Sequence, residues 1–167
     1  MSLSFIVGNA SDVFAGELAR VVDGVLRERF ALPERHDPYE SEPVEASGWR
    51  LLQQRVLRMV DSCPQLASID AYQAVYVPAV LEQVEHLPVA NLADPLQIGS
   101  LPLLVDELKR FAAAAALPTD DLELMKLAAH YLEQEDIDAD LDVQTYVQLM
   151  LSAKQAMTRG QALWTVV

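Results

Sequence analysis

The amino-acid sequence predicts an all-α fold, a single-domain helical bundle of five to seven helices. Several segments place apolar residues at three- and four-residue steps with charged residues between them, which is typical of amphipathic helices. Prolines, glycines and capping residues separate these segments. The chain has 167 residues, 51% of them hydrophobic, which is enough for one substantial core. We therefore expect residues 1–167 to form one helical domain.

The first predicted helix covers residues 11–32, where Phe14, Leu18 and Val25 share one apolar face. Residues 33–47 (PERHDPYESEPVEAS) follow, with three prolines, five acids and no periodic apolar pattern. Such a composition indicates an exposed loop, and connections of this length are uncommon inside compact domains. We expect a mobile acidic loop here.

The second predicted helix begins at Ser47 and stops before Cys63, with Arg50, Arg55 and Arg58 directed outward. Residues 65–87 are ambiguous, because alternation at positions 72, 74 and 76 suits a short strand whereas residues 70–85 also have helical spacing. We interpret them as a helix kinked or broken at Pro78, whose ring removes a backbone donor. The second helix directs its apolar residues toward the core: Trp49, Leu52, Val56, Met59 and Val60.

Three further helices are predicted in the second half of the chain. One begins at Ser100 and ends at Pro118, the next is capped by Thr119, and the last covers residues 141–158 and stops at Gly160. The apolar residues 162–167 are expected to pack back on the bundle. The inward residues of the three helices are expected to be Leu104, Val105, Leu108, Phe111, Ala115, Leu122, Met125, Ala129, Leu132, Val143, Tyr146, Val147, Met150 and Met157.

The charge balance excludes some classes of function. Twelve Lys and Arg residues against 25 Asp and Glu residues give a net charge of −13. This charge repels phosphate backbones, which disfavours direct nucleic-acid binding, and it attracts basic proteins. Cys63 is the single cysteine, so no internal disulfide forms. No secretion signal and no apolar stretch near the roughly 20 residues of a membrane span is present, so we expect a cytoplasmic protein without a membrane partner.

The densest cluster of one charge is at residues 133–142 (EQEDIDADLD), which hold six acids and no base. A calcium-binding loop of the EF-hand type needs a glycine at its sixth position and a glutamate at its twelfth. Counted from Asp136 or Asp138, this sequence has neither residue at those positions, so a calcium loop does not fit. Two interpretations remain: a solvated turn in which Asp140 or Asp142 caps the last helix, or an acidic docking edge for a basic protein. The candidate partner-binding residues are Glu133, Glu135, Asp136, Asp138, Asp140 and Asp142.

A metal site is the alternative. Glu82 and His86 are one helical turn apart in the predicted helix, as are His130 and Glu133, and two helices offering such pairs could hold zinc, iron or manganese. The chain nevertheless has no Glu-x-x-His pair and no His-Glu-x-x-His motif. It also lacks a Gly-x-Ser-x-Gly elbow and any phosphate-binding glycine loop. No cofactor is therefore expected.

Two classes of function remain after these exclusions. The favoured one is a non-enzymatic acidic binding protein, of the inhibitor, immunity or adaptor type, that docks a basic protein through residues 133–142 and the acids of residues 40–45. The other is a metal-binding helical-bundle enzyme built on Glu82, His86, His130 and Glu133. Seven of the twelve basic residues precede Met59 and all seven are arginines. Arg20, Arg27, Arg50 and Arg58 could pair with acids on the C-terminal helices, or they could form a basic strip beside the acidic edge, which would give a polar molecule that self-associates.

Overall fold

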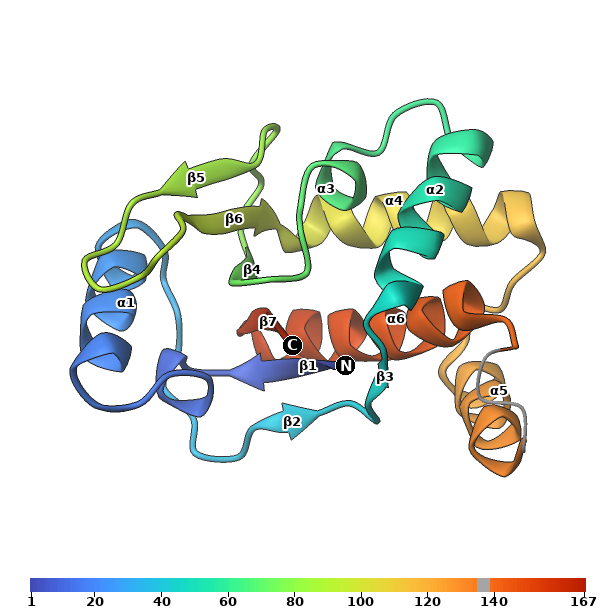
Figure 1. Ribbon diagram of the computed structural model, residues 1–167, viewed down its shortest axis with the longest axis horizontal. Coiled ribbons are helices and arrows are strands. Elements are labelled where there is room, and N and C mark those ends of the chain that lie inside the picture. The colour runs from blue at the N-terminus through green and yellow to red at the C-terminus, as the bar shows by residue number, and fades with distance from the viewer. Residues whose placement is uncertain (135–138) are drawn as a thin grey trace.

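The computed structural model shows a mixed α/β fold, so the prediction of an all-α helical bundle is wrong (Figure 1). It describes residues 1–134 and 139–167. The helices are the 3-10 turn η1 (Ala10–Asp12), α1 (Gly16–Arg29), α2 (Ser47–Met59), α3 (Pro64–Ala67), α4 (Leu101–Ala115), α5 (Asp121–Glu133) and α6 (Leu141–Arg159). The strands are β1 (Ser2–Gly8), β2 (Tyr39–Glu40), β3 (Val44–Glu45), β4 (Ala74–Val77), β5 (Glu85–Leu87), β6 (Leu96–Ser100) and β7 (Ala162–Val166).

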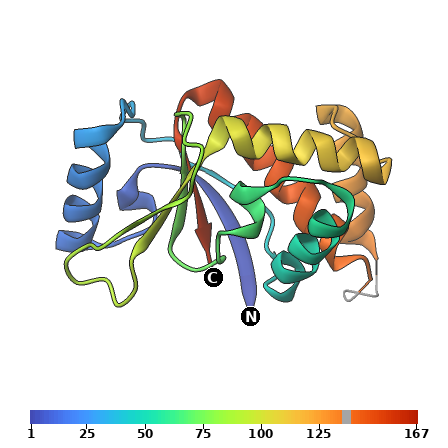
Figure 2. The same cartoon turned by 90° about the horizontal axis from the view of Figure 1, so that it is seen from above.

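The described residues form one seven-stranded mixed sheet in the order β2-β1-β7-β4-β6-β5, and β3 also pairs with β1. β7 lies antiparallel between β1 and β4, while β4 and β6 are parallel. Figure 2 shows α1 on one side of the sheet and α2, α4 and α6 on the other. The two ends of the chain therefore meet in the middle of the sheet rather than against a helical bundle.

The sequences of the strands suit a sheet whose two faces are both covered by other parts of the chain. In β1, Leu3, Phe5 and Val7 alternate toward the helices α2, α4 and α6 and are fully buried. All four residues of β4 are buried, which is usual for a strand that has a parallel neighbour and helices on both faces. The predicted helix over residues 65–87 is wrong, because this segment holds α3, β4 and β5.

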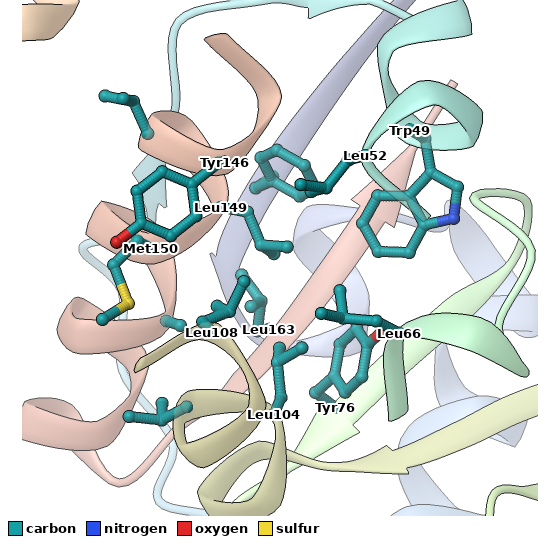
Figure 3. Close-up of a cluster of buried hydrophobic side chains, with 14 of the residues drawn as sticks. Trp49, Leu52, Leu66, Tyr76, Leu104, Leu108, Tyr146, Leu149, Met150 and Leu163 are labelled. Carbon is teal, nitrogen blue, oxygen red and sulfur yellow. The ribbon is translucent and has the colours of Figure 1, made fainter. Parts of the chain in front are cut away.

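The larger core lies between the sheet and the helices α2, α3, α4 and α6 (Figure 3). Two buried polar groups in it are satisfied by backbone carbonyls: Trp49 Nε1 donates to Ile69 at 3.0 Å, and Tyr76 Oη donates to Gln65 at 2.9 Å. The predicted inward residues that are buried here are Trp49, Leu52, Val56, Leu104, Val105, Leu108, Phe111, Val143, Tyr146, Val147 and Met150. The smaller core packs α1 on the other face of the sheet around Trp164.

The segment 33–47 contains β2 and β3, which both run antiparallel to β1. Between them Ser41 is buried, and its hydroxyl accepts a hydrogen bond from the Phe5 N–H at 2.9 Å. The mobility of this segment stays a prediction. Over the described ranges, no helix has the length and apolar character needed to cross a membrane.

Candidate functional site

The helix α5 is the most weakly buried of the long helices. Its N-cap Asp120 accepts a hydrogen bond from the Glu123 N–H at 3.2 Å, whereas Thr119 was predicted as the cap. Leu124 is the one fully buried residue among its 13. Leu127 and Tyr131 are half-buried against the larger core. The helix packs along α6 and lies at the edge of the molecule (Figure 1).

One stripe on the solvent side of α5 is apolar. Leu122, Met125 and Leu132 are 59%, 53% and 64% exposed, and Ala129 between them is exposed as well. These four residues follow one another at steps of three, four and three, so they lie in one stripe along the helix. We name this set the α5 stripe. Its prediction as an inward face is wrong, because Leu124 and its neighbours on the opposite side face the core instead.

The α5 stripe is bordered by acidic residues. Asp121 and Glu123 occupy the first turn, and the exposed Glu133 ends the helix. The Glu123 carboxylate is 2.9 Å from Lys126 Nζ, and Asp121 pairs with Lys154 of α6. Together with Lys154, residues 121–133 hold three acids and two lysines, and Glu133 is the acid that no ion pair among the described residues involves.

The predicted acidic edge is only partly described. Glu133 and Asp140 are exposed, whereas Glu135, Asp136 and Asp138 lie outside the described residues. Asp140 is the N-cap of α6 by position, with φ of 52°, but its side chain makes no capping hydrogen bond. The remaining acid, Asp142, is half-buried.

Asp142 belongs to an internal ion pair. Its carboxylate accepts a hydrogen bond from Arg55 Nη1 at 2.9 Å, which joins α6 to α2. Because both side chains are less than one-third exposed, this pair is better placed to hold two helices together than to meet a partner. Of the predicted edge, Glu133 is exposed at the end of α5, and Asp140 is exposed at the start of α6.

The residues of the alternative metal site do not converge. Glu82 lies in a bend and His86 is exposed on β5, whereas His130 and Glu133 are on α5. β5 and α5 lie at opposite ends of the molecule (Figure 1). His130 Nε2 is 2.8 Å from Gln134 Nε2. No group of three or more His, Cys, Asp or Glu side chains within residues 1–134 and 139–167 is arranged to hold a metal ion.

A hollow of about 830 Å³ opens beside the N-terminus of α2. Two of its polar side chains bind the neighbouring loop: Gln53 Nε2 donates to the carbonyls of Leu66 and Ile69 at 2.7 Å, and Gln97 Oε1 accepts from the Asp70 N–H at 2.8 Å. These two side chains hold residues 66–70 in place. The charged side chains of Glu45, Arg50 and Asp70 also line the hollow.

Cys63 is buried. Burial raises the pKa of its thiol, and the nearby charge of Glu107 raises it further. A thiol with a raised pKa is a poor nucleophile at neutral pH, because the thiolate is the reactive form.

Comparisons with protein-family models, with curated proteins and with solved structures find no match to this chain. The assignment of function therefore depends on the geometry of the site alone.

Proposed function

We propose that this chain is a non-enzymatic binding protein, of the inhibitor, immunity or adaptor type, and that α5 docks a basic protein partner. The observation that carries the proposal is the α5 stripe. An apolar stripe on a helix of a globular protein normally faces the core. Here one side of α5 packs on α6, whereas Leu122, Met125 and Leu132 on the other side are more than half exposed.

The shape of the α5 stripe favours a helical partner. Apolar residues at steps of three, four and three form a seam along which a second helix can lie. Burying Leu122, Met125 and Leu132 from half exposure contributes about 3–5 kcal/mol, at roughly 1.5–3 kcal/mol for each side chain buried completely. A micromolar complex needs about 8 kcal/mol, so the border of the stripe must contribute as well.

The charge of that border selects the partner. Glu133 is exposed beside Leu132, and the chain carries −13 overall. A basic partner is steered toward such a surface, and acidic partners are repelled. The proposal includes the reducing cytoplasm as the place of action, where the single cysteine needs no disulfide partner. A metal-assisted enzyme is not proposed, because His86 and His130 lie at opposite ends of the molecule.

Two labelled helical peptides with the same leucine seam test the proposal, one flanked by Lys and Arg and the other by Glu. Fluorescence anisotropy should show that the basic peptide binds at least tenfold more tightly than the acidic one. Leu132→Asp should weaken binding of the basic peptide by at least tenfold, because it puts a charge into the α5 stripe. Equal binding of the two peptides, or full binding to Leu132→Asp, would contradict the proposal.

A matched control comes from α6. Met157 is 44% exposed and lies outside the α5 stripe, so Met157→Asp makes the same kind of change elsewhere. This variant should bind the basic peptide as the unchanged protein does. Circular dichroism of both variants checks that their helices are intact.

A further inference from the structure

The helix α2 carries a second exposed face. Trp49, Leu52 and Val56 face the core. On the opposite side Leu51 and Leu57 are 42% and 58% exposed. The residues of this face, which we name the α2 face, are Arg50, Leu51, Gln54, Leu57 and Arg58.

The α2 face is basic in a strongly acidic protein. Residues 46–60 contain three arginines and no acid. Arg55 is taken up by Asp142, as described above. Among the residues that the structure describes, no ion pair involves Arg50 or Arg58. Both guanidinium groups are exposed beside leucines, so this face combines apolar area with positive charge.

We propose that the basic surface recognised by the α5 stripe is the α2 face of a second copy of this chain. The inference rests on the proposed docking function of α5 and names its partner. Both helices have 13 residues, which corresponds to about 20 Å of helix at roughly 1.5 Å per residue, so the two faces match in length. Leu51 and Leu57 supply the apolar contact, and Arg58 meets the acidic border around Glu133.

Charge selects this pairing over the symmetric ones. Two α5 stripes brought together would place two acidic borders against each other, and two α2 faces would place arginines against arginines. Like charges across an interface disfavour association, whereas the mixed pairing joins opposite charges. The net charge of −13 on each copy opposes assembly, but about 0.15 M salt confines that repulsion to roughly 8 Å. We therefore expect weak, concentration-dependent self-association.

The positions of the two helices allow both faces to be used at once. α2 and α5 both pack on α6, and Figures 1 and 2 show them on different sides of that helix. One copy thus offers an acidic face to one neighbour and a basic face to another. Such a head-to-tail contact adds copies until a ring closes or a chain grows.

A mixing experiment tests the inference. Leu57→Asp breaks the α2 face and leaves the α5 stripe intact, and Leu132→Asp does the reverse. In sedimentation velocity at increasing concentration, the unchanged protein should form species larger than a monomer. Each variant alone should stay monomeric, and an equal mixture of the two should form a one-to-one dimer, because only the mixture contains one intact face of each kind.

Three results would overturn the inference. An unchanged protein that stays monomeric would do so, as would variants that still associate alone. A Leu57→Asp protein that dimerises while Leu132→Asp does not would show a symmetric contact between α5 stripes instead. Leu51→Asp replaces Leu57→Asp if the latter does not fold, and Met157→Asp is the control that should associate normally.

The peptide assay separates this inference from the proposed function. If the protein stays monomeric but Leu57→Asp still binds the basic peptide at least tenfold better than the acidic one, docking by α5 stands and only the second copy is wrong as its partner. Charge reversal gives a further check. Arg58→Glu should weaken self-association about tenfold, and mixing it with Glu133→Arg should restore association.

Discussion

Glu107 of α4 is a buried charge whose removal should destabilise the protein measurably. The side chain is 2% exposed, and its two carboxylate oxygens accept hydrogen bonds from the Gln65 and Leu66 N–H groups, both at 2.9 Å. These are N–H groups of the first turn of α3, which have no partner within their own helix. Glu107 thus caps α3 from a neighbouring helix and joins the two.

The expected cost of Glu107→Gln follows from these two bonds. The variant keeps the shape of the side chain, but its amide nitrogen must face one of the two N–H donors. One hydrogen bond to a charged group is lost, worth about 1.5–3 kcal/mol, and one buried donor is left unpaired. We expect the free energy of unfolding to fall by about 2–3 kcal/mol at neutral pH, which at about 2 kcal/mol per M corresponds to a urea midpoint lower by roughly 1 M.

Urea titration followed by tryptophan fluorescence measures this change. Asp106→Asn is the matched control, because Asp106 is the preceding residue of α4 and is exposed, so its variant should stay within about 0.5 kcal/mol of the unchanged protein. A Glu107→Gln midpoint equal to that of the control would refute the reasoning, since it would mean that the two hydrogen bonds contribute nothing to stability.

The pH dependence of this difference has a definite sign. Burial raises the pKa of Glu107 above its ordinary value of 4.5, and the backbone hydrogen bonds from Gln65 and Leu66 only partly oppose this. The folded state therefore holds its proton to higher pH than the unfolded state. Ionisation of Glu107 therefore lowers the stability of the unchanged protein as the pH rises from about 4.5 through the folded pKa. Glu107→Gln has no group there to titrate, so this pH dependence should be absent from the variant.

Three further substitutions have expected outcomes in the same unfolding assay. Gly48→Ala should lower the free energy of unfolding by about 1–3 kcal/mol, because a Cβ at this position overlaps Thr145 Oγ1 where α2 crosses α6. An unchanged free energy of unfolding would show that the two helices move apart to admit the methyl group. Ala116→Gly should raise the melting temperature by about 2–4 °C, because Ala116 has φ of 54°, a left-handed conformation that glycine adopts at lower cost. An unchanged melting temperature would show that the alanine is not strained there. Trp164→Phe should cost about 1–2 kcal/mol, because Nε1 donates to the Gly8 carbonyl at 3.0 Å; a neutral result would argue against that bond.

The helices were predictable because each carries its evidence within one segment. α4 has the cap at Ser100, whose hydroxyl accepts a hydrogen bond from the Leu103 N–H at 3.4 Å, and an apolar face that is buried as expected. α6 ends at Gly160 with φ of 63°, which confirms the predicted stop. The start of α1 was less well predicted. Asn9 begins the 3-10 turn η1, and α1 itself begins at Gly16.

The sheet was missed because its evidence lies in segments far apart in the chain. β1 pairs with β7, so that Val7 lies opposite Leu163, and neither strand shows its partner locally. β1 does alternate at Leu3, Phe5 and Val7, which is a signal that could have been recognised. β4 is buried on both faces, and a fully apolar run of four residues cannot be distinguished from part of a helix by its period.

For the candidate site, the existence of α5 was predicted correctly and its orientation was not. Leu122 and Met125 were expected inside, yet Leu124 is the residue that anchors the helix. The amphipathic pattern cannot choose a face when apolar residues occur on both sides. The tertiary contact with α6 makes that choice. Of the acids, Glu133 is exposed as a docking residue requires, whereas Asp142 is held by Arg55.

The distribution of charge carries more information about function than its total. A net charge of −13 is sufficiently explained by solubility, and it would be compatible with a uniformly acidic surface. Solubility does not explain why Leu57 and Leu132 are each more than half exposed on helices of equal length. It also does not explain why residues 46–60 contain no acid whereas α5 contains three. A pair of complementary docking faces accounts for both facts, since apolar contact supplies affinity and opposite charge selects the partner.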